Sequence, residues 1–156
     1  MIKINLICMG DIKEKYLKEA INEYSKRISR FANLNIIELK ENVAKSLSSA
    51  DIDLALKKDS DEIIKHVKGH IICLDIVANQ LTSEDFASKI QKISLNSSEI
   101  TFIIGASNGL HNKIKEIAKE KISFSKMTFP HQLMRVIFLE QLYRAFTIIN
   151  NISYHK

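Results

Sequence analysis

Short strand-like runs alternate with amphipathic stretches along this chain, and that alternation limits its fold more than any other feature. Five such runs are present: Lys3–Met9, Asn35–Leu39, His70–Ile76, Ile100–Ile104 and Lys121–Phe124. Most of them are apolar throughout, with no regular exchange of apolar and polar residues, which is typical of strands buried on both faces. We therefore predict an α/β fold, with a mainly parallel sheet and helices on both of its faces.

The stretches between these runs have helical periodicity. In Lys13–Arg30 apolar residues recur every four positions, and Ser83–Ile93 follows Thr82, which stands three residues before Asp85 in a capping-box pattern. Polar, serine-rich Lys40–Ala50 is expected to be a loop. Three more helices are expected, the last of them opened by Pro130, at Asp51–Val67, Leu110–Lys119 and His131–Asn150.

Length and composition fit one domain over residues 1–156. Of the 156 residues, 46% are hydrophobic and 26% charged, enough for one core without disulfide or metal support. No apolar run approaches the roughly 20 residues that cross a bilayer, and the first residues lack a signal-peptide pattern. Cys8 and Cys73 lie inside apolar runs, so we expect buried free thiols, a cytoplasmic protein and no metal site. The net charge of +5 weakly favours a polyanionic partner such as RNA.

Ligands of parallel sheets bind at the carboxyl ends of the strands, which directs attention to three segments. These are Ile76–Asn79, Gly105–Gly109 and Ser125–Pro130. Gly105–Gly109 contains two of the four glycines, but it has neither the P-loop ending nor the G-x-G-x-x-G pattern. It is therefore either a plain turn or a site for a ligand that is not bound through phosphate.

An apolar segment before the last helix is the second candidate site. Phe124–Gln132 contains the only proline, two aromatic residues and a methionine, and such a loop can enclose an adenine ring. The alternative is a loop that only packs against the core.

The last helix is apolar nearly all round, and we expect it at the edge of the sheet. Burial within the monomer and an oligomer interface are equally good explanations of its composition. Glu140 and Arg144 are spaced to pair with each other; alternatively, Arg135 and Arg144 project toward a polyanion. The end of the chain, Tyr154–Lys156, is either frayed or combines a stacking aromatic, an imidazole and a cation for an unpaired RNA base.

Three motifs are long or distinctive enough to point to a family: IGASNGL at Ile104–Leu110, SFSKMTFPHQLMRVIFLEQLYRAF at Ser123–Phe146, and YHK at Tyr154–Lys156. Through these motifs, and more weakly over its whole length, the chain resembles the large-subunit rRNA methyltransferase H family. These proteins are pseudouridine N3-methyltransferases of the SPOUT superfamily. The resemblance implies a SPOUT fold with a C-terminal trefoil knot, a homodimer, S-adenosylmethionine as cofactor, and a pseudouridine target in a hairpin loop of large-subunit rRNA within the ribosome.

The resemblance also implies roles for particular residues. The cofactor pocket is carried over to Leu74, Gly105, Phe124, Ser125, Lys126, Met127, Thr128 and Phe129. His155 is the leading candidate to remove the N3 proton or position the base, and Tyr154 would contact that base. Arg135 and Arg144 would hold phosphate or stabilise the developing anion, and Lys156 would add phosphate contacts. His131, beside the cofactor loop, is a weaker alternative base and a candidate RNA contact. Completion of the site by the partner's tail stays open.

Two departures from the family pattern bear on these assignments. The family usually has a second glycine where this chain has Ala106, which we expect to have an ordinary φ. It often has Arg-Gly where this chain has Asn150 and Asn151, and asparagine tolerates the left-handed conformation that such a turn needs. The alternatives are methylation of another RNA base, a ribosome-binding factor without enzymatic activity, and a nucleotide-dependent enzyme.

Overall fold

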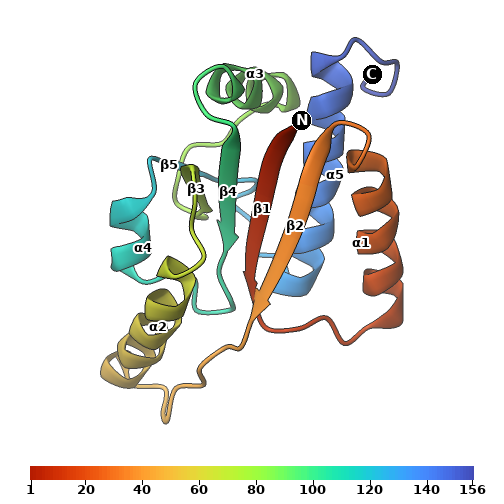
Figure 1. Ribbon diagram of the computed structural model, residues 1–156. Helices are drawn as coiled ribbons and strands as arrows, with labels where there is room; N and C mark the ends of the chain where they lie inside the picture. Colours follow the sequence, from red (N-terminus) through yellow and green to blue (C-terminus); the bar gives the residue numbers. More distant parts are fainter.

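Five parallel strands form one sheet in the order β2-β1-β4-β3-β5 (Figure 1), so the predicted sheet is confirmed. The computed structural model describes residues 1–156. The strands are β1 (Ile2–Met9), β2 (Ala32–Leu39), β3 (His70–Leu74), β4 (Glu99–Ile104) and β5 (Glu120–Ile122). β2 begins at Ala32, earlier than the predicted run Asn35–Leu39. As an edge strand it pairs on one side only, with β1, and the Asn35 side chain hydrogen-bonds to Asn5 of β1.

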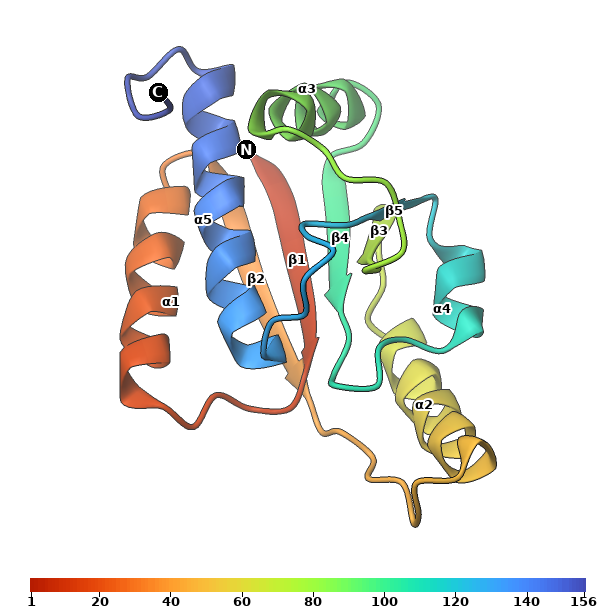
Figure 2. The ribbon, with the colours of Figure 1, turned by 180° about the vertical axis from the view of Figure 1, so that it is seen from behind.

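Helices cover both faces of the sheet. They are α1 (Lys15–Ile28), α2 (Ser49–Ile64), α3 (Ser83–Ser94), α4 (Asn112–Ile117) and α5 (His131–Ile149). α1, α3 and α5 lie on one face and α2 and α4 on the other (Figures 1 and 2). Thr82 caps α3 as predicted, since its hydroxyl accepts the backbone N–H of Asp85 at 3.0 Å. None of the helices combines the length and apolarity needed to cross a bilayer.

The expected position of the last helix is wrong. α5 does not lie at the sheet edge; it packs over the centre of the sheet, between α1 and α3 (Figure 2). Its all-round apolar composition fits this position, because the sheet and two helices each contact a different side of it. Phe138, Leu139 and Leu142 are fully buried within the larger of two cores.

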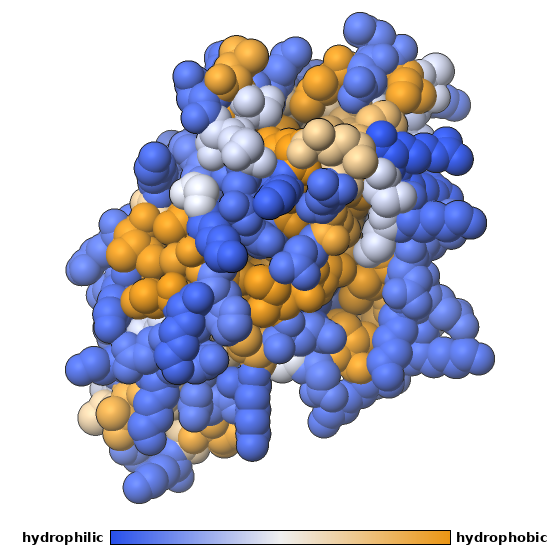
Figure 3. Space-filling model, viewed as in Figure 1, coloured by the Kyte–Doolittle hydropathy of each residue, from blue (hydrophilic) through white to orange (hydrophobic).

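The smaller core lies between the opposite face of the sheet and the helices α2 and α4. It includes Ile7 and Met9 of β1 and Ile103 of β4. Viewed from that side, apolar surface shows in the middle of the molecule and is bordered by polar side chains (Figure 3). The two cores give the sheet the burial on both faces that its apolar strands require.

Two distant segments cross beside the carboxyl ends of β3 and β5, where residues 123–130 run past residues 75–82 (Figure 2). Ser123 donates its backbone N–H to the carbonyl of Asn79 at 3.0 Å, and its hydroxyl lies 3.1 Å from the carbonyl of Ile76. Buried Ser123 therefore ties the two segments together. The trefoil knot implied by the resemblance stays a prediction.

Candidate active site

The three strand ends selected from the sequence converge on one cleft with a volume of about 730 Å³. Leu74 and Asp75 form one wall, the Gly105–Gly109 turn a second, and residues 122–131 a third. A cleft of this size is in the range that takes a cofactor-sized ligand. Of the eight residues predicted for the pocket, only exposed Lys126 does not line it.

The Gly105–Gly109 turn closes on itself. The backbone N–H of Gly109 donates to the carbonyl of Ala106 at 2.9 Å, and a Cβ at Gly105 would lie 2.6 Å from the carbonyl oxygen of Gly109. Glycine is thus needed at residue 105 by the turn itself, and at residue 109 by a φ of +78°. Ala106 is not among the residues with positive φ, as we predicted.

The third wall is anchored in the larger core. The ring of Phe124 packs against Phe86 and Phe138, with centroid distances of 5.8 and 5.9 Å. The residues that follow turn outward, and the Ser125 hydroxyl accepts the backbone N–H of Met127 at 2.9 Å. Met127 is 75% exposed. The segment therefore has a fixed beginning and an open apolar rim.

The cleft contains one ion pair, which the sequence analysis missed. Asp75 and Lys115 are 3.2 Å apart, and the Asp75 side chain is only 9% exposed. Asp75 directly follows β3, which ends at Leu74, but the predicted strand extended to Ile76, so the strand-end rule passed over it. Lys115 could not be found by that rule, because it comes from α4, and only the tertiary structure brings it to the cleft.

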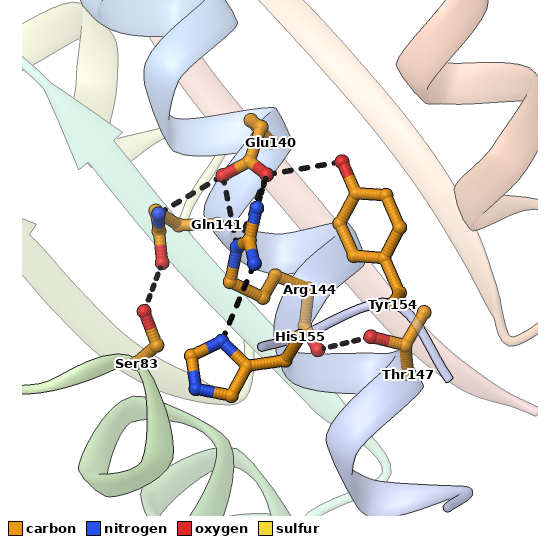
Figure 4. Close-up of polar contacts among 7 residues, drawn as sticks. All are labelled: Ser83, Glu140, Gln141, Arg144, Thr147, Tyr154 and His155. Atoms are coloured by element: carbon orange, nitrogen blue, oxygen red, sulfur yellow. Dashed lines mark hydrogen bonds and ion pairs between the residues drawn. The ribbon is translucent and has the colours of Figure 1, made fainter. Parts of the chain in front are cut away.

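A charged cluster lies at the other end of α5 (Figure 4). Arg144 pairs with Glu140 at 2.6 Å, and the Tyr154 hydroxyl donates to the same carboxylate at 3.1 Å. Arg144 also lies over the Tyr154 ring, 4.7 Å from its centroid. His155 completes the cluster through Arg144 at Nδ1 (3.3 Å) and Glu84 at Nε2 (2.8 Å). The structure therefore brings Arg144, Tyr154 and His155 together, and their catalytic roles stay predictions.

The contacts define the protonation states in this cluster. An arginine only donates, so Nδ1 of His155 is the acceptor and Nε2 carries the hydrogen that Glu84 accepts. Burial and the Glu140 carboxylate raise the pKa of Tyr154 to about 12, which keeps the phenol protonated. The pKa of Glu84 is lowered by hydrogen bonds from its own backbone N–H and from His155.

Arg135 lies elsewhere than expected. It is 1% exposed, and its guanidinium donates to the carbonyls of Met9 (2.8 Å) and Gly10 (2.6 Å) and to Glu38 (2.8 Å). A buried side chain with these partners cannot reach phosphate, which corrects the expectation that Arg135 contacts RNA. It instead joins the first turns of α5 to the end of β1.

The remaining predicted residues lie at the two ends of α5. His131 lines the cleft, and Lys156 is exposed at the end of the chain. Asn151 has a φ of 54°, so asparagine does take the left-handed conformation at the turn into the tail. The tail then folds back, and the backbone N–H of Ile152 donates to the carbonyl of Thr147 at 2.9 Å.

The cleft and the charged cluster are separated along α5. Met134 lines the cleft, and Arg144 belongs to the cluster ten residues later. At 1.5 Å per helical residue, the separation is about 15 Å. The structure thus defines an α/β protein with a ligand cleft at its strand ends and a separate cluster of reactive side chains.

Comparison with known proteins gives the family. The family described as predicted SPOUT methyltransferase matches residues 2–155. A relative from Methanococcus maripaludis is 53% identical over 159 residues, covering 99% of this chain and all of its own (100%). The ribosomal RNA large subunit methyltransferase H of Caldicellulosiruptor saccharolyticus is 46% identical, covering 98% of this chain and 99% of its own. The chain belongs to the SPOUT methyltransferase family.

Solved structures share the fold at low sequence identity. A methylase-family protein of Haemophilus influenzae superposes with a TM-score of 0.54 at 14% identity, covering 99% of this chain and 70% of its own. A Legionella pneumophila protein, solved in complex with the bound cofactor SAM, has a TM-score of 0.52 at 12% identity, covering 92% of this chain and 66% of its own.

Proposed function

We propose that this protein transfers a methyl group from S-adenosylmethionine to N3 of a pseudouridine in a hairpin loop of large-subunit rRNA, within assembled cytoplasmic ribosomes. Relatives at 46% identity that carry the name ribosomal RNA large subunit methyltransferase H support the reaction and the RNA. The observation that carries the proposal is the cleft in which the ends of β3, β4 and β5 converge.

The residues of the cleft fit this cofactor. Its walls offer apolar side chains for the adenine, and exposed backbone in the Gly105–Gly109 turn and in residues 124–129. Asp75 is the one carboxylate that lines the cleft, and it suits a ligand with positive charge and ribose hydroxyls. Leu74, Gly105 and residues 124–129 would hold the cofactor, which supplies an activated methyl group when bound.

His155 and Arg144 have complementary roles in this proposal. The target N3 carries a proton that must leave as the methyl group arrives, and Nδ1 of neutral His155 can accept it. Nδ1 faces Arg144 at 3.3 Å, so proton uptake requires the guanidinium to move aside. Arg144 then donates to a carbonyl oxygen of the base, where negative charge collects.

Other polar residues hold the RNA. Tyr154 contacts the target base as a neutral phenol, because its raised pKa excludes a phenolate at neutral pH. Lys156 and His131 contact the RNA backbone from opposite ends of α5. The target base must leave its stack to reach the protein, which costs least in a loop.

A homodimer resolves the separation between the cleft and the charged cluster. Reacting atoms must approach within about 3–3.5 Å, which is much less than the interval along α5. If two copies of α5 pack antiparallel, the cluster of one copy lies beside the cleft of the other. The partner's tail then completes each site.

Mixing two inactive variants tests this arrangement. Gly105→Val damages only the cleft, and His155→Ala damages only the tail. Each variant alone should fail to methylate ribosomes, whereas a mixture refolded together should regain turnover, because one site per heterodimer is intact. A mixture that stays inactive while heterodimers form would rule out completion by the partner.

The reaction itself is tested by incubating the protein with ribosomes and labelled S-adenosylmethionine and mapping the labelled nucleotide. Label on N3 of a hairpin pseudouridine supports the proposal, and label on another base refutes the proposed target. Ribosome binding without cofactor binding in calorimetry would indicate a binding factor without enzymatic activity.

The role of His155 fails if His155→Ala keeps full turnover.

A further inference from the structure

A second hollow lies beside the cleft and has no charged residue in its lining. Its volume is about 340 Å³, and it lies between the start of α3, residues 122–129 and the middle of α5. Apolar side chains form much of its lining, and the polar remainder consists of hydroxyls and one amide: Thr82, Ser83, Ser123, Ser125 and Gln141. A lining without cations does not suit phosphate; it suits a neutral ring that offers hydrogen bonds at one edge.

Along α5, the hollow lies between the cleft and the charged cluster of the same chain. On one face of α5, Met134 lines the cleft, Ile137 and Gln141 line the hollow, and Arg144 belongs to the charged cluster. Their spacing of three and four residues places them on successive turns. The hollow also shares Phe124 and Phe129 with the cleft. A ligand in the hollow is therefore near the cleft, beside which the proposed dimer places the charged cluster of the partner.

The amide of Gln141 is held in one orientation (Figure 4). Its Oε1 accepts the Ser83 hydroxyl at 2.9 Å, and its Nε2 donates to Glu140 at 2.9 Å. A primary amide has two N–H donors and two acceptor lone pairs, so one of each stays available. A donor and an acceptor of one amide can together meet a ligand edge where a carbonyl stands next to an N–H.

We propose that the hollow binds the target nucleobase and that Gln141 is the residue that distinguishes pseudouridine from uridine; this inference rests on the proposed function. In pseudouridine the ring N1 carries hydrogen and is adjacent to the C2 carbonyl, whereas in uridine N1 carries the ribose. Oε1 of Gln141 accepts the N1–H, and Nε2 donates to the C2 carbonyl. The N3 edge and the C4 carbonyl then stay free for the cofactor in the cleft and for the partner's His155 and the partner's Arg144.

The test compares ribosomes with pseudouridine and ribosomes with uridine at the target position. Gln141→Met keeps the length of the side chain but removes both hydrogen-bonding groups. We expect kcat/KM for pseudouridine ribosomes to fall about 10- to 100-fold, with little change for uridine ribosomes and no change in calorimetric affinity for S-adenosylmethionine. Gln91→Met, at an exposed position of α3 outside the hollow and the cleft, should behave as wild type.

Ser83→Ala provides an independent variant. It keeps Gln141 but releases its Oε1, so the preference for pseudouridine should fall in the same direction by a smaller factor. The inference is overturned if Gln141→Met loses activity equally on both substrates or keeps the full preference for pseudouridine. Absence of wild-type turnover on both kinds of ribosome would instead refute the proposed function.

Discussion

The two ends of α5 contribute to two sites, the cleft and the charged cluster, that are built in different ways. At its first turns the cleft is built from strand ends, a self-closing glycine turn and apolar side chains, with a single ion pair. At its last turns charged and aromatic side chains satisfy one another around Glu140 (Figure 4). The cleft depends on backbone shape, whereas the cluster depends on side-chain charge and hydrogen bonding.

Two arginines of α5 show this difference between the cleft and the charged cluster. Arg135 is buried at the cleft end and binds backbone carbonyls at the end of β1 as well as the Glu38 carboxylate. Arg144 is partly exposed at the tail end, and its partners are all side chains. Arg135 therefore supports the shape of the protein, and Arg144 is free to exchange its partners for those of a substrate.

Replacing the two arginines should have opposite consequences. Arg135→Met removes a buried guanidinium and leaves the Met9 and Gly10 carbonyls without a partner, so the free energy of unfolding should fall by about 3–4 kcal/mol. Arg144→Met should lower it by no more than about 1 kcal/mol but should suppress methyl transfer. Denaturant unfolding and turnover on ribosomes measure the two effects. Equal loss of stability in both variants would contradict the division between shape and charge.

Substitution of Gly105 should weaken cofactor binding in the cleft, whereas substitution of Gly109 should not. Gly105→Ala places a methyl group against the Gly109 carbonyl, so the turn must open and S-adenosylmethionine should bind about 100-fold more weakly. Gly109→Ala meets no atom within 4 Å, and its positive φ costs stability of about 1–2 kcal/mol without closing the cleft. Calorimetry on both variants checks this contrast, which disappears if Gly105→Ala binds normally.

The smallest effect is expected from the Tyr154 hydroxyl. Folding raises its pKa from 10.0 to about 12, so the folded state favours the protonated phenol. This contribution to stability is present below pH 10 and is lost as the pH rises toward 12. Tyr154→Phe should flatten that alkaline loss and lower turnover by less than about tenfold. Thermal unfolding between pH 8 and 12 measures the slope, and an unchanged slope would show that another group titrates.

Much of the architecture was predictable because it follows from local patterns. Apolar runs of strand length indicated the buried parallel strands. The N-cap at Thr82 was recognisable because Asp85 follows it by three residues. The cleft was predictable in outline, since strand ends of a parallel sheet meet at one edge. The Gly105 turn and Asn151 were predictable from conformational preference.

Side-chain roles on α5 were harder to predict because the helix is apolar on every side. Without a polar face, spacing could not tell buried Arg135 from partly exposed Arg144. Gln141 carried no signal at all in the sequence, since its partners Ser83 and Glu140 matter only once α3 packs beside α5.

The sequence by itself determined the parallel sheet, its buried strands and the three turns that form the cleft, because each depends on residues close together in the chain. Only the tertiary structure decided that α5 crosses the centre of the sheet, that Arg135 is buried, and that a neutral hollow separates the cleft from the charged cluster. Those features depend on contacts between residues far apart in the chain, such as Arg135 with Gly10 and Gln141 with Ser83. Such contacts form only when the elements pack, and no local pattern records them.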